Sequence, residues 1–171
     1  MILDSGNRTE YATGAVRDKQ KGKGRTDLLP LDVVSEVVDH ICGDGNYLGR
    51  ILTEISDFQL TGNREQLACA LTWFLCDASQ YTGWADMLLD VSIHYEEGCE
   101  KYSENNWQKG IYTKDYINSA VRHLLKWYRG DGDERHDRAF VWNILCCMWT
   151  VKNKPELNTY GKDIEEWTLI N

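Results

Sequence analysis

Three glutamates lie within five residues of one another, in a segment that has the periodicity of a helix. Glu96 and Glu100 are four residues apart and share a helical face, and Glu97 is three residues before Glu100. Neighbouring carboxylates repel one another unless solvent or cations compensate, and Mg²⁺ and Mn²⁺ prefer carboxylate oxygens. The triad therefore predicts a divalent-cation site that can also take phosphates, with a solvated acidic face as the alternative.

A second acidic group stands where a later helical stretch begins. Glu134 and Asp137 are three residues apart and can face the same way, with His136 between them and Asn143 further along that side. Acids at a helix N-terminus are favoured by the helix dipole, so we expect Asp133 to cap this helix. Glu134 and Asp137 are further candidate metal ligands, with capping as the alternative.

Other side chains near these groups are candidates for contacts with a substrate. His94 can act as a general base or support a neighbouring group, although a lone histidine is more often structural. Trp107 follows two asparagines in an expected loop, where it can stack on a base or anchor the core. Arg122 and Lys126 can contact phosphates or only solvate their helix. Together these residues favour metal-assisted hydrolysis at phosphorus.

Helical periodicity dominates the segments that must position these residues. Thr113 is the expected N-cap of the helix that carries Arg122, and Gly130–Asp133 form the turn after it. No segment alternates as a strand does, so we predict an all-α helical bundle. The expected helices cover residues 30–41, 48–58, 67–75, 84–101 and 114–129, and a last helix runs from its cap at Asp133 to the stop at Pro155. The apolar stripe expected on the glutamate helix consists of Trp84, Leu88, Val91 and Tyr95.

The first 29 residues differ from the rest of the chain. They are polar, rich in glycine and locally basic, and Arg17, Lys23 and Arg25 are among their cations. Their composition predicts an arm or loop, not a packed element. The arm is either a solvated tail or a segment that folds over an anionic ligand. We therefore divide the chain into an arm, residues 1–29, and a single helical domain, residues 30–171.

Composition and charge exclude several classes of protein. The net charge of −8 disfavours nucleic-acid binding, and no apolar run is long enough to span a membrane. The start of the chain lacks the pattern of a signal peptide. The six cysteines contain no C-x-x-C pair, and we expect buried, reduced thiols. A cytoplasmic protein is the expectation, in the host cell if the chain is encoded by a phage.

The spacing Glu96-Glu97-x-x-Glu100 resembles that of the MazG-like, all-α nucleoside triphosphate pyrophosphohydrolases. Their signature is E-E-x-x-E on one helix and E-x-x-D on a later one, and Glu134-Arg135-His136-Asp137 fits the second half. The resemblance is stronger to phage dATP/dGTP diphosphohydrolases, including the MazZ type. The stretches that carry it are 4–8, 13–18, 22–25, 27–30, 96–98, 101–102, 106–110, 122–126 and 142–143.

The resemblance implies a MazG-like helical bundle that hydrolyses dGTP, and also GTP or dATP as candidates, to the monophosphate and pyrophosphate. It implies Mg²⁺ or Mn²⁺ as cofactor, a homo-oligomer (dimer or tetramer), and a role in 2-aminoadenine nucleotide synthesis in a phage. Glu96, Glu97 and Glu100 are the expected catalytic residues and, with Glu134 and Asp137, the expected metal ligands. Expected substrate contacts are Arg17, Lys23, Arg25, Asn106, Trp107, Lys109, Arg122, Lys126, His136 and Asn143.

Two other functions fit the same residues. The first is a non-catalytic helical module that binds a nucleotide or a protein through the basic arm. The second is a metal-dependent phosphatase that releases orthophosphate. A binding module has no need of three clustered glutamates, so their substitution separates it from an enzyme.

Overall fold

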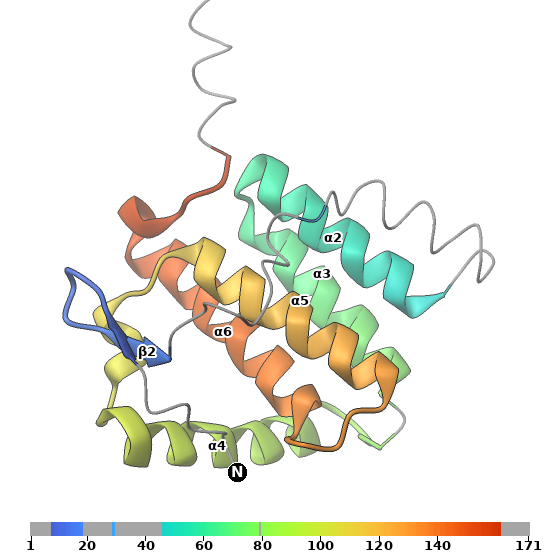
Figure 1. The fold of residues 1–171 in the computed structure, drawn as a ribbon. Coiled ribbons are helices and arrows are strands. Elements are labelled where there is room, and N and C mark those ends of the chain that lie inside the picture. Colours follow the sequence, from blue (N-terminus) through green and yellow to red (C-terminus); the bar gives the residue numbers. More distant parts are fainter. Residues whose placement is uncertain (1–7, 19–28, 30–45, 79, 162–171) are drawn as a thin grey trace, which may run out of the picture.

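The protein is a bundle of α-helices with a small β-hairpin against one end (Figure 1). The computed structural model describes residues 8–18, 29, 46–78 and 80–161. The expected helix over residues 30–41 and the arm residues Lys23 and Arg25 lie outside the described residues. The helices are α2 (Tyr47–Thr61), α3 (Arg64–Asp77), α4 (Trp84–Tyr102), α5 (Thr113–Arg129) and α6 (His136–Asn153), with 3-10 turns η2 (Asn106–Lys109) and η3 (Pro155–Leu157).

Two helical hairpins form the body of the bundle. Helices α2 and α3 are joined at Gly62, whose φ of 68° is left-handed, and Asn63 caps α3 by accepting a hydrogen bond from the Glu65 amide. Helices α5 and α6 pack along one another after a turn at Gly130, with φ of 83°. Figure 1 shows α4 running along the other side of α6 from α3.

Aromatic rings fill the core where the two hairpins meet. Phe74 of α3 lies 4.7 Å from the ring of Phe140 on α6 and 5.0 Å from that of Trp127 on α5. Phe58 of α2 is fully buried as well. Burying large apolar side chains is the main favourable contribution to folding, and these contacts join α2, α3, α5 and α6. The predicted all-α bundle is thus confirmed.

Part of the predicted arm is a packed element, which corrects the sequence prediction. Strands β1 (Arg8–Glu10) and β2 (Val16–Asp18) pair antiparallel, and Ala15 between them is fully buried. Asn106 of η2 pairs with the backbone of Val16, accepting from its amide at 2.9 Å and donating to its carbonyl at 2.8 Å. The hairpin forms despite its polar composition because these long-range contacts stabilise it.

A buried aspartate fixes the other end of the hairpin. Asp18 is 7% exposed and accepts hydrogen bonds at 2.9 Å from Arg8, from Lys101 and from the Tyr102 hydroxyl. Two of these donors belong to α4, so the hairpin and the glutamate helix are held together. Arg17, one residue before Asp18, is thereby carried to a defined place.

The buried face of α4 differs from the predicted stripe. Met87, Val91 and His94 are the buried residues, whereas Leu88 is 50% exposed. The spacing is the one expected of an amphipathic helix, but the face is shifted by one residue. The cause is that His94, a polar residue, takes a buried position. None of the helices in the described residues combines the length and the hydrophobicity needed to cross a membrane.

Both predicted helix caps are wrong. Helix α5 begins at Thr113 itself, and the Thr113 hydroxyl bonds Thr159 and Asn158 after η3 instead of its own helix. Helix α6 is preceded by Arg135, and the Asp133 carboxylate is bonded by Lys126 and by His136. In each case another side chain takes the place of the local backbone amide.

The cysteines are only partly as expected. Cys146 and Cys147 on α6 are fully buried, and burial raises the pKa of the Cys146 thiol to about 12. Cys69 and Cys76 on α3 are exposed, which contradicts the expectation for those two. Their helix turns its other side to the core, where Leu67, Ala70 and Phe74 are buried.

Candidate active site

The hairpin presents Arg17 to helices α5 and α6. One terminal nitrogen of its guanidinium donates to the Asn143 side-chain oxygen at 2.5 Å, and the group lies over the rings of Tyr116 (5.2 Å) and Trp142 (6.0 Å). Asn143 is oriented for this contact because its own amide donates to the Ala139 carbonyl. The structure therefore brings Arg17 and Asn143 together, although they are 126 residues apart in the chain.

Helix α6 contributes a second arginine, Arg138, which is buried and 5% exposed. One of its terminal nitrogens lies 3.7 Å from the Glu97 carboxylate on α4. This ion pair joins the glutamate helix to α6. Arg138 was not among the predicted site residues, although an arginine inside the apolar run of α6 was a signal that something charged must face it.

Three buried donors around these arginines have no hydrogen-bond partner in the described part of the chain. They are one terminal nitrogen of Arg17, the Nε of Arg138 and the indole nitrogen of Trp142. A buried donor without an acceptor destabilises a fold by about 1–3 kcal/mol, and more when it is charged. Their grouping between β2 and α6 points to an anionic acceptor.

A third arginine, Arg122 of α5, adds to the positive charge. Its guanidinium donates to the Ser119 hydroxyl at 3.0 Å. Burial, and then the charge of Arg17, lower the pKa of Arg122 to about 10, while Glu134 acts in the opposite direction. Arginine side chains whose charges repel one another are found close together most readily where a multivalent anion binds between them. The predicted phosphate contact of Arg122 agrees with this position.

His94 lies at the edge of the same group. It is 8% exposed and packs against Trp142, with ring centroids 5.4 Å apart. Burial, and then the charge of Arg138, lowers its pKa to about 4, while Glu97 acts in the opposite direction. The imidazole is therefore neutral at pH 7 and able to accept a proton.

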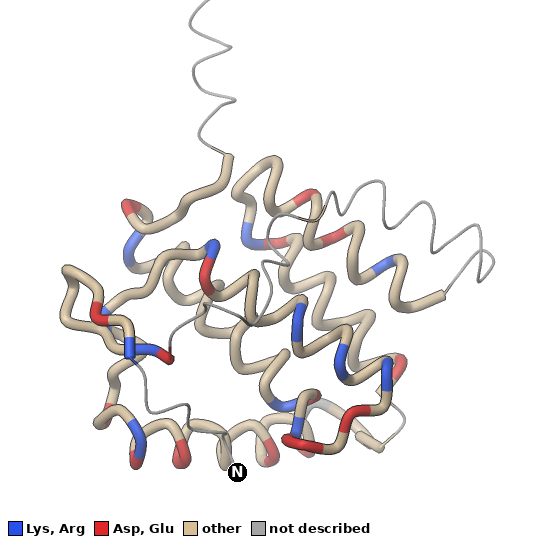
Figure 2. Tube along the Cα trace, viewed as in Figure 1, with Lys and Arg blue, Asp and Glu red and all other residues tan. Residues whose placement is uncertain are grey.

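The glutamates of α4 are divided between two environments. Glu97 turns toward Arg138, whereas Glu96 and Glu100 are exposed on the outer side of the helix. Figure 2 shows acidic positions spaced along α4 and basic positions along α5. The carboxylates of α4 suit a hard cation chemically, and Glu97 brings that donor type to the arginine group.

The second acidic group separates in the structure. Glu134 turns toward His123 of α5, with 3.3 Å between its carboxylate and the histidine Nδ1. Asp137, 2% exposed, accepts hydrogen bonds from Gln80, from Tyr81 and from two nitrogens of Arg135. Burial raises the pKa of Asp137, but the Arg135 and other hydrogen bonds outweigh it and the net shift is downward. The metal-ligand role of Asp137 stays a prediction, and these donors compete with it.

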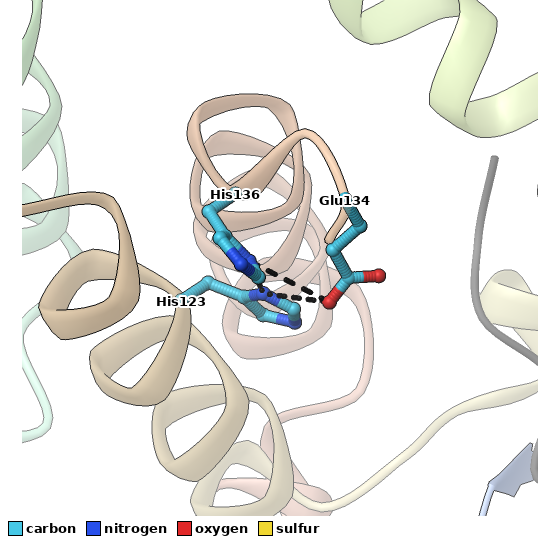
Figure 3. A group of neighbouring side chains, drawn as sticks. All are labelled: His123, Glu134 and His136. Atoms are coloured by element: carbon cyan, nitrogen blue, oxygen red, sulfur yellow. Dashed lines mark hydrogen bonds and ion pairs between the residues drawn. The ribbon is translucent and has the colours of Figure 1, made fainter. Parts of the chain in front are cut away.

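A cluster of two histidines and a carboxylate forms where α5 meets the start of α6 (Figure 3). His123, Glu134 and His136 each present one atom, and these atoms lie within 4.8 Å of one another. Asp131 and Asp133 form a second such group with His136. Neither group includes a glutamate of α4. His123 was missed as a ligand because its partners lie after the turn that follows its helix.

Most of the remaining predicted contact residues have structural partners. Asn106 holds β2, and Trp107 packs edge-on against Tyr95 and Trp149, at 5.5 Å and 5.1 Å, which favours the core-anchor interpretation. Lys126 pairs with Asp133 at 2.9 Å, and Lys109 is exposed.

Comparison with known proteins finds a family similarity over the part of the chain that holds most of this site. The model of the family described as "dATP/dGTP diphosphohydrolase, N-terminal" matches residues 77–160, which include α4, α5 and α6. Searches of curated proteins and of solved structures found no match. Residues 77–160, just under half of the chain, are therefore similar to the dATP/dGTP diphosphohydrolases, a family of nucleoside triphosphate pyrophosphohydrolases.

Proposed function

We propose that this protein hydrolyses dGTP to dGMP and pyrophosphate with the help of Mg²⁺ or Mn²⁺. GTP and dATP are the other candidate substrates. The observation that carries the proposal is the group of buried donors on Arg17, Arg138 and Trp142 that lack an acceptor. A triphosphate supplies several charged acceptor oxygens to such a group.

The arginines perform the electrostatic part of the reaction. Arg17, Arg122 and Arg138 come from β2, α5 and α6, so their charges approach a bound triphosphate from different elements. Charge that develops on the departing pyrophosphate is stabilised by these fixed cations without reorganisation. The neutral His94 imidazole can accept a hydrogen bond from the attacking water and orient it.

The divalent cation belongs on the acidic side of this group. Glu96, Glu97 and Glu100 would hold it. The further predicted ligands, Glu134 and Asp137, face His123 and Arg135 in this structure instead. The cation would supply Lewis-acid stabilisation of the phosphate oxygens. Glu97 has a second task, because its contact with Arg138 fixes that guanidinium before substrate binds.

The test is product analysis with each dNTP and NTP in Mg²⁺, in Mn²⁺ and in chelator. We expect dGMP and pyrophosphate in equal amounts, and no turnover in chelator. Glu97→Gln should abolish turnover, while Glu104→Gln, an exposed glutamate beyond the end of α4, serves as the matched control. Orthophosphate as product would indicate a phosphatase. No turnover of any nucleotide would indicate the non-catalytic module.

Two wider proposals follow from the resemblance. The product dGMP would feed the synthesis of 2-aminoadenine nucleotides in a phage. The protein would also act as a homo-oligomer, which sedimentation of the full chain would show as a mass that is a multiple of 19.8 kDa. A single species at the monomer mass would contradict the second proposal.

A further inference from the structure

Three potential metal-ligand atoms converge beside the arginine group, at the junction of α5 and α6. The Nδ1 atoms of His123 and His136 lie 3.0 Å apart. One oxygen of Glu134 lies 3.3 Å from the first and 3.5 Å from the second. Figure 3 shows all three side chains pointing to one place, His123 from α5 and Glu134 and His136 from the segment where α6 begins.

These separations match those between ligands of one metal ion. Nitrogen and oxygen ligands bind first-row metals such as zinc at about 2.0–2.2 Å, so neighbouring ligands are about 3.0–3.5 Å apart in octahedral or tetrahedral geometry. Two imidazoles and one carboxylate on one side of an ion leave its other positions open.

The tautomer of His136 is already set for metal binding. Its Nε2 lies 2.7 Å from the Asp133 carboxylate, which in turn is held by Lys126 at 2.9 Å. An ionised carboxylate can accept hydrogen bonds but cannot donate them. The His136 proton is therefore on Nε2, and the lone pair of Nδ1 faces the cluster. A carboxylate behind a histidine ligand is the usual arrangement at metal sites.

Hydrogen bonds within the cluster explain its geometry less completely than a bound cation does. If His123 carries its proton on Nδ1, that proton has two acceptors in reach, His136 Nδ1 and Glu134, and can be well aligned with only one. If the proton is on Nε2, three lone pairs face one another. A cation satisfies all three atoms at once.

We propose that His123, Glu134 and His136 bind one transition-metal ion of the class that accepts imidazole, such as Zn²⁺, Co²⁺ or Mn²⁺. The preference follows from the two nitrogen ligands, because Mg²⁺ favours all-oxygen sites. The site does not depend on which nucleotide the protein hydrolyses. Its test is metal binding in the absence of nucleotide, so failure of this inference and failure of the proposed function are separate results.

The experiment titrates Co²⁺ into the chelator-treated full chain and follows the visible d–d absorption, with Zn²⁺ and Mg²⁺ as competitors. We expect one Co²⁺ per chain, displaced by Zn²⁺ and not by equimolar Mg²⁺. Substitution of a residue that hydrogen-bonds to a metal ligand commonly lowers metal affinity about 10–100-fold. Loss of a ligand itself, in His123→Ala or Glu134→Gln, should therefore weaken Co²⁺ binding by at least about tenfold. Glu134→Gln preserves side-chain size, and circular dichroism checks that both variants fold.

The control is Asp131→Asn, which lies in the other acidic group and outside the proposed ligand set. It should bind Co²⁺ as the wild type does. Three results would overturn the proposal. The first is no uptake by the wild type. The second is weakening by Asp131→Asn without weakening by His123→Ala. The third is a sulfur-to-cobalt charge-transfer band that both cluster variants retain, which would place the ion on the exposed cysteines of α3.

Discussion

At the scale of single residues, the buried nitrogens of two arginines are the feature that most directly connects this fold to an anionic substrate. Arg17 and Arg138 each hold a buried nitrogen without a hydrogen-bond acceptor in the described part of the chain. Such groups are retained in proteins where they have a function, because an unpaired buried donor opposes folding. Two predictions belong to this scale.

Arg138→Lys is expected to lower kcat/KM for dGTP about 10- to 100-fold, since hydrogen bonds to charged groups are each worth about 1.5–3 kcal/mol. Lysine keeps the charge but lacks the Nε–H and the planar fork. Steady-state kinetics measure the loss. Arg129→Lys, at an arginine whose side chain is 70% exposed on α5, is the matched control and should leave kcat/KM unchanged. Wild-type kinetics in Arg138→Lys would contradict the assigned role.

His94 should make the fold sensitive to acid. Its pKa is lowered from 6.5 to about 4 by burial and by Arg138. Below pH 6.5 the unfolded chain binds a proton that the folded chain does not, so stability falls between pH 6.5 and 4. The loss from this group is about 2–3 kcal/mol at pH 4.5. Urea unfolding in metal-free buffer at pH 7 and 4.5 measures it.

The matched variant for this prediction is His94→Gln, which cannot titrate in this range. Between pH 7 and 4.5 this variant should lose about 2–3 kcal/mol less stability than the wild type, whatever its own stability at pH 7. An identical loss of stability in both proteins would show that protonation of His94 does not cause the pH dependence.

At the scale of elements, the hairpin and the short turn η2 act as one unit. Asn106 bonds both backbone groups of Val16, and Arg17 follows directly. The position of that arginine therefore depends on an asparagine in a different element. The sequence singled out Asn106 through a resemblance and expected it to contact substrate, whereas the structure shows it holding the strand that delivers Arg17.

Asn106→Ala should leave two buried backbone groups unpaired and lower stability by about 2 kcal/mol. We expect KM for dGTP to rise more than kcat falls, because the variant loosens a binding element and keeps the helices intact. Gln108→Ala, at an exposed position of η2, is the control. Limited proteolysis after Arg8 or Arg17 should be faster in the Asn106 variant alone.

The turn between α2 and α3 is a second element-scale feature. Gly62 has a positive φ, and an added Cβ would lie 2.8 Å from the Tyr160 carbonyl. Left-handed backbone costs a non-glycine residue about 1–2 kcal/mol, so Gly62→Ala should destabilise by about 2–3 kcal/mol, the close contact included. Gly132→Ala meets no atom within 4 Å and should change the unfolding temperature little. Equal melting of both variants would contradict this account.

At the scale of the whole molecule, the charge of the arginine group is opposite in sign to the net charge of the chain. The chain has a net charge of −8, yet Arg17, Arg122 and Arg138 come from β2, α5 and α6 to one region. An acidic surface repels long polyanions, while a buried basic group accepts a small one.

Duplex DNA should therefore fail to bind in about 50 mM salt, where electrostatic binding is strong, whereas pyrophosphate should bind and inhibit. Fluorescence anisotropy with labelled DNA and inhibition kinetics measure the two. Tight DNA binding would show that the basic group is open along the surface. Absence of inhibition by pyrophosphate would contradict its role as a phosphate site.

The amino-acid sequence by itself determined the helices, because helical periodicity is a local property of neighbouring side chains. It predicted α2 to α6 with small errors at their ends, and it named Arg17, Arg122, Glu97, Glu134, His136 and Asn143. It placed the buried face of α4 one residue away, because a histidine occupies the core there.

Only the tertiary structure decided which of these residues meet. Arg17 reaches Asn143 because Asn106 and Asp18 hold a hairpin that has little strand character of its own. His123 joins Glu134 and His136 because the turn at Gly130 folds α6 back along α5. Buried charges such as Arg138 are tolerated only when partners from other helices compensate them, and no local pattern states which helices those are.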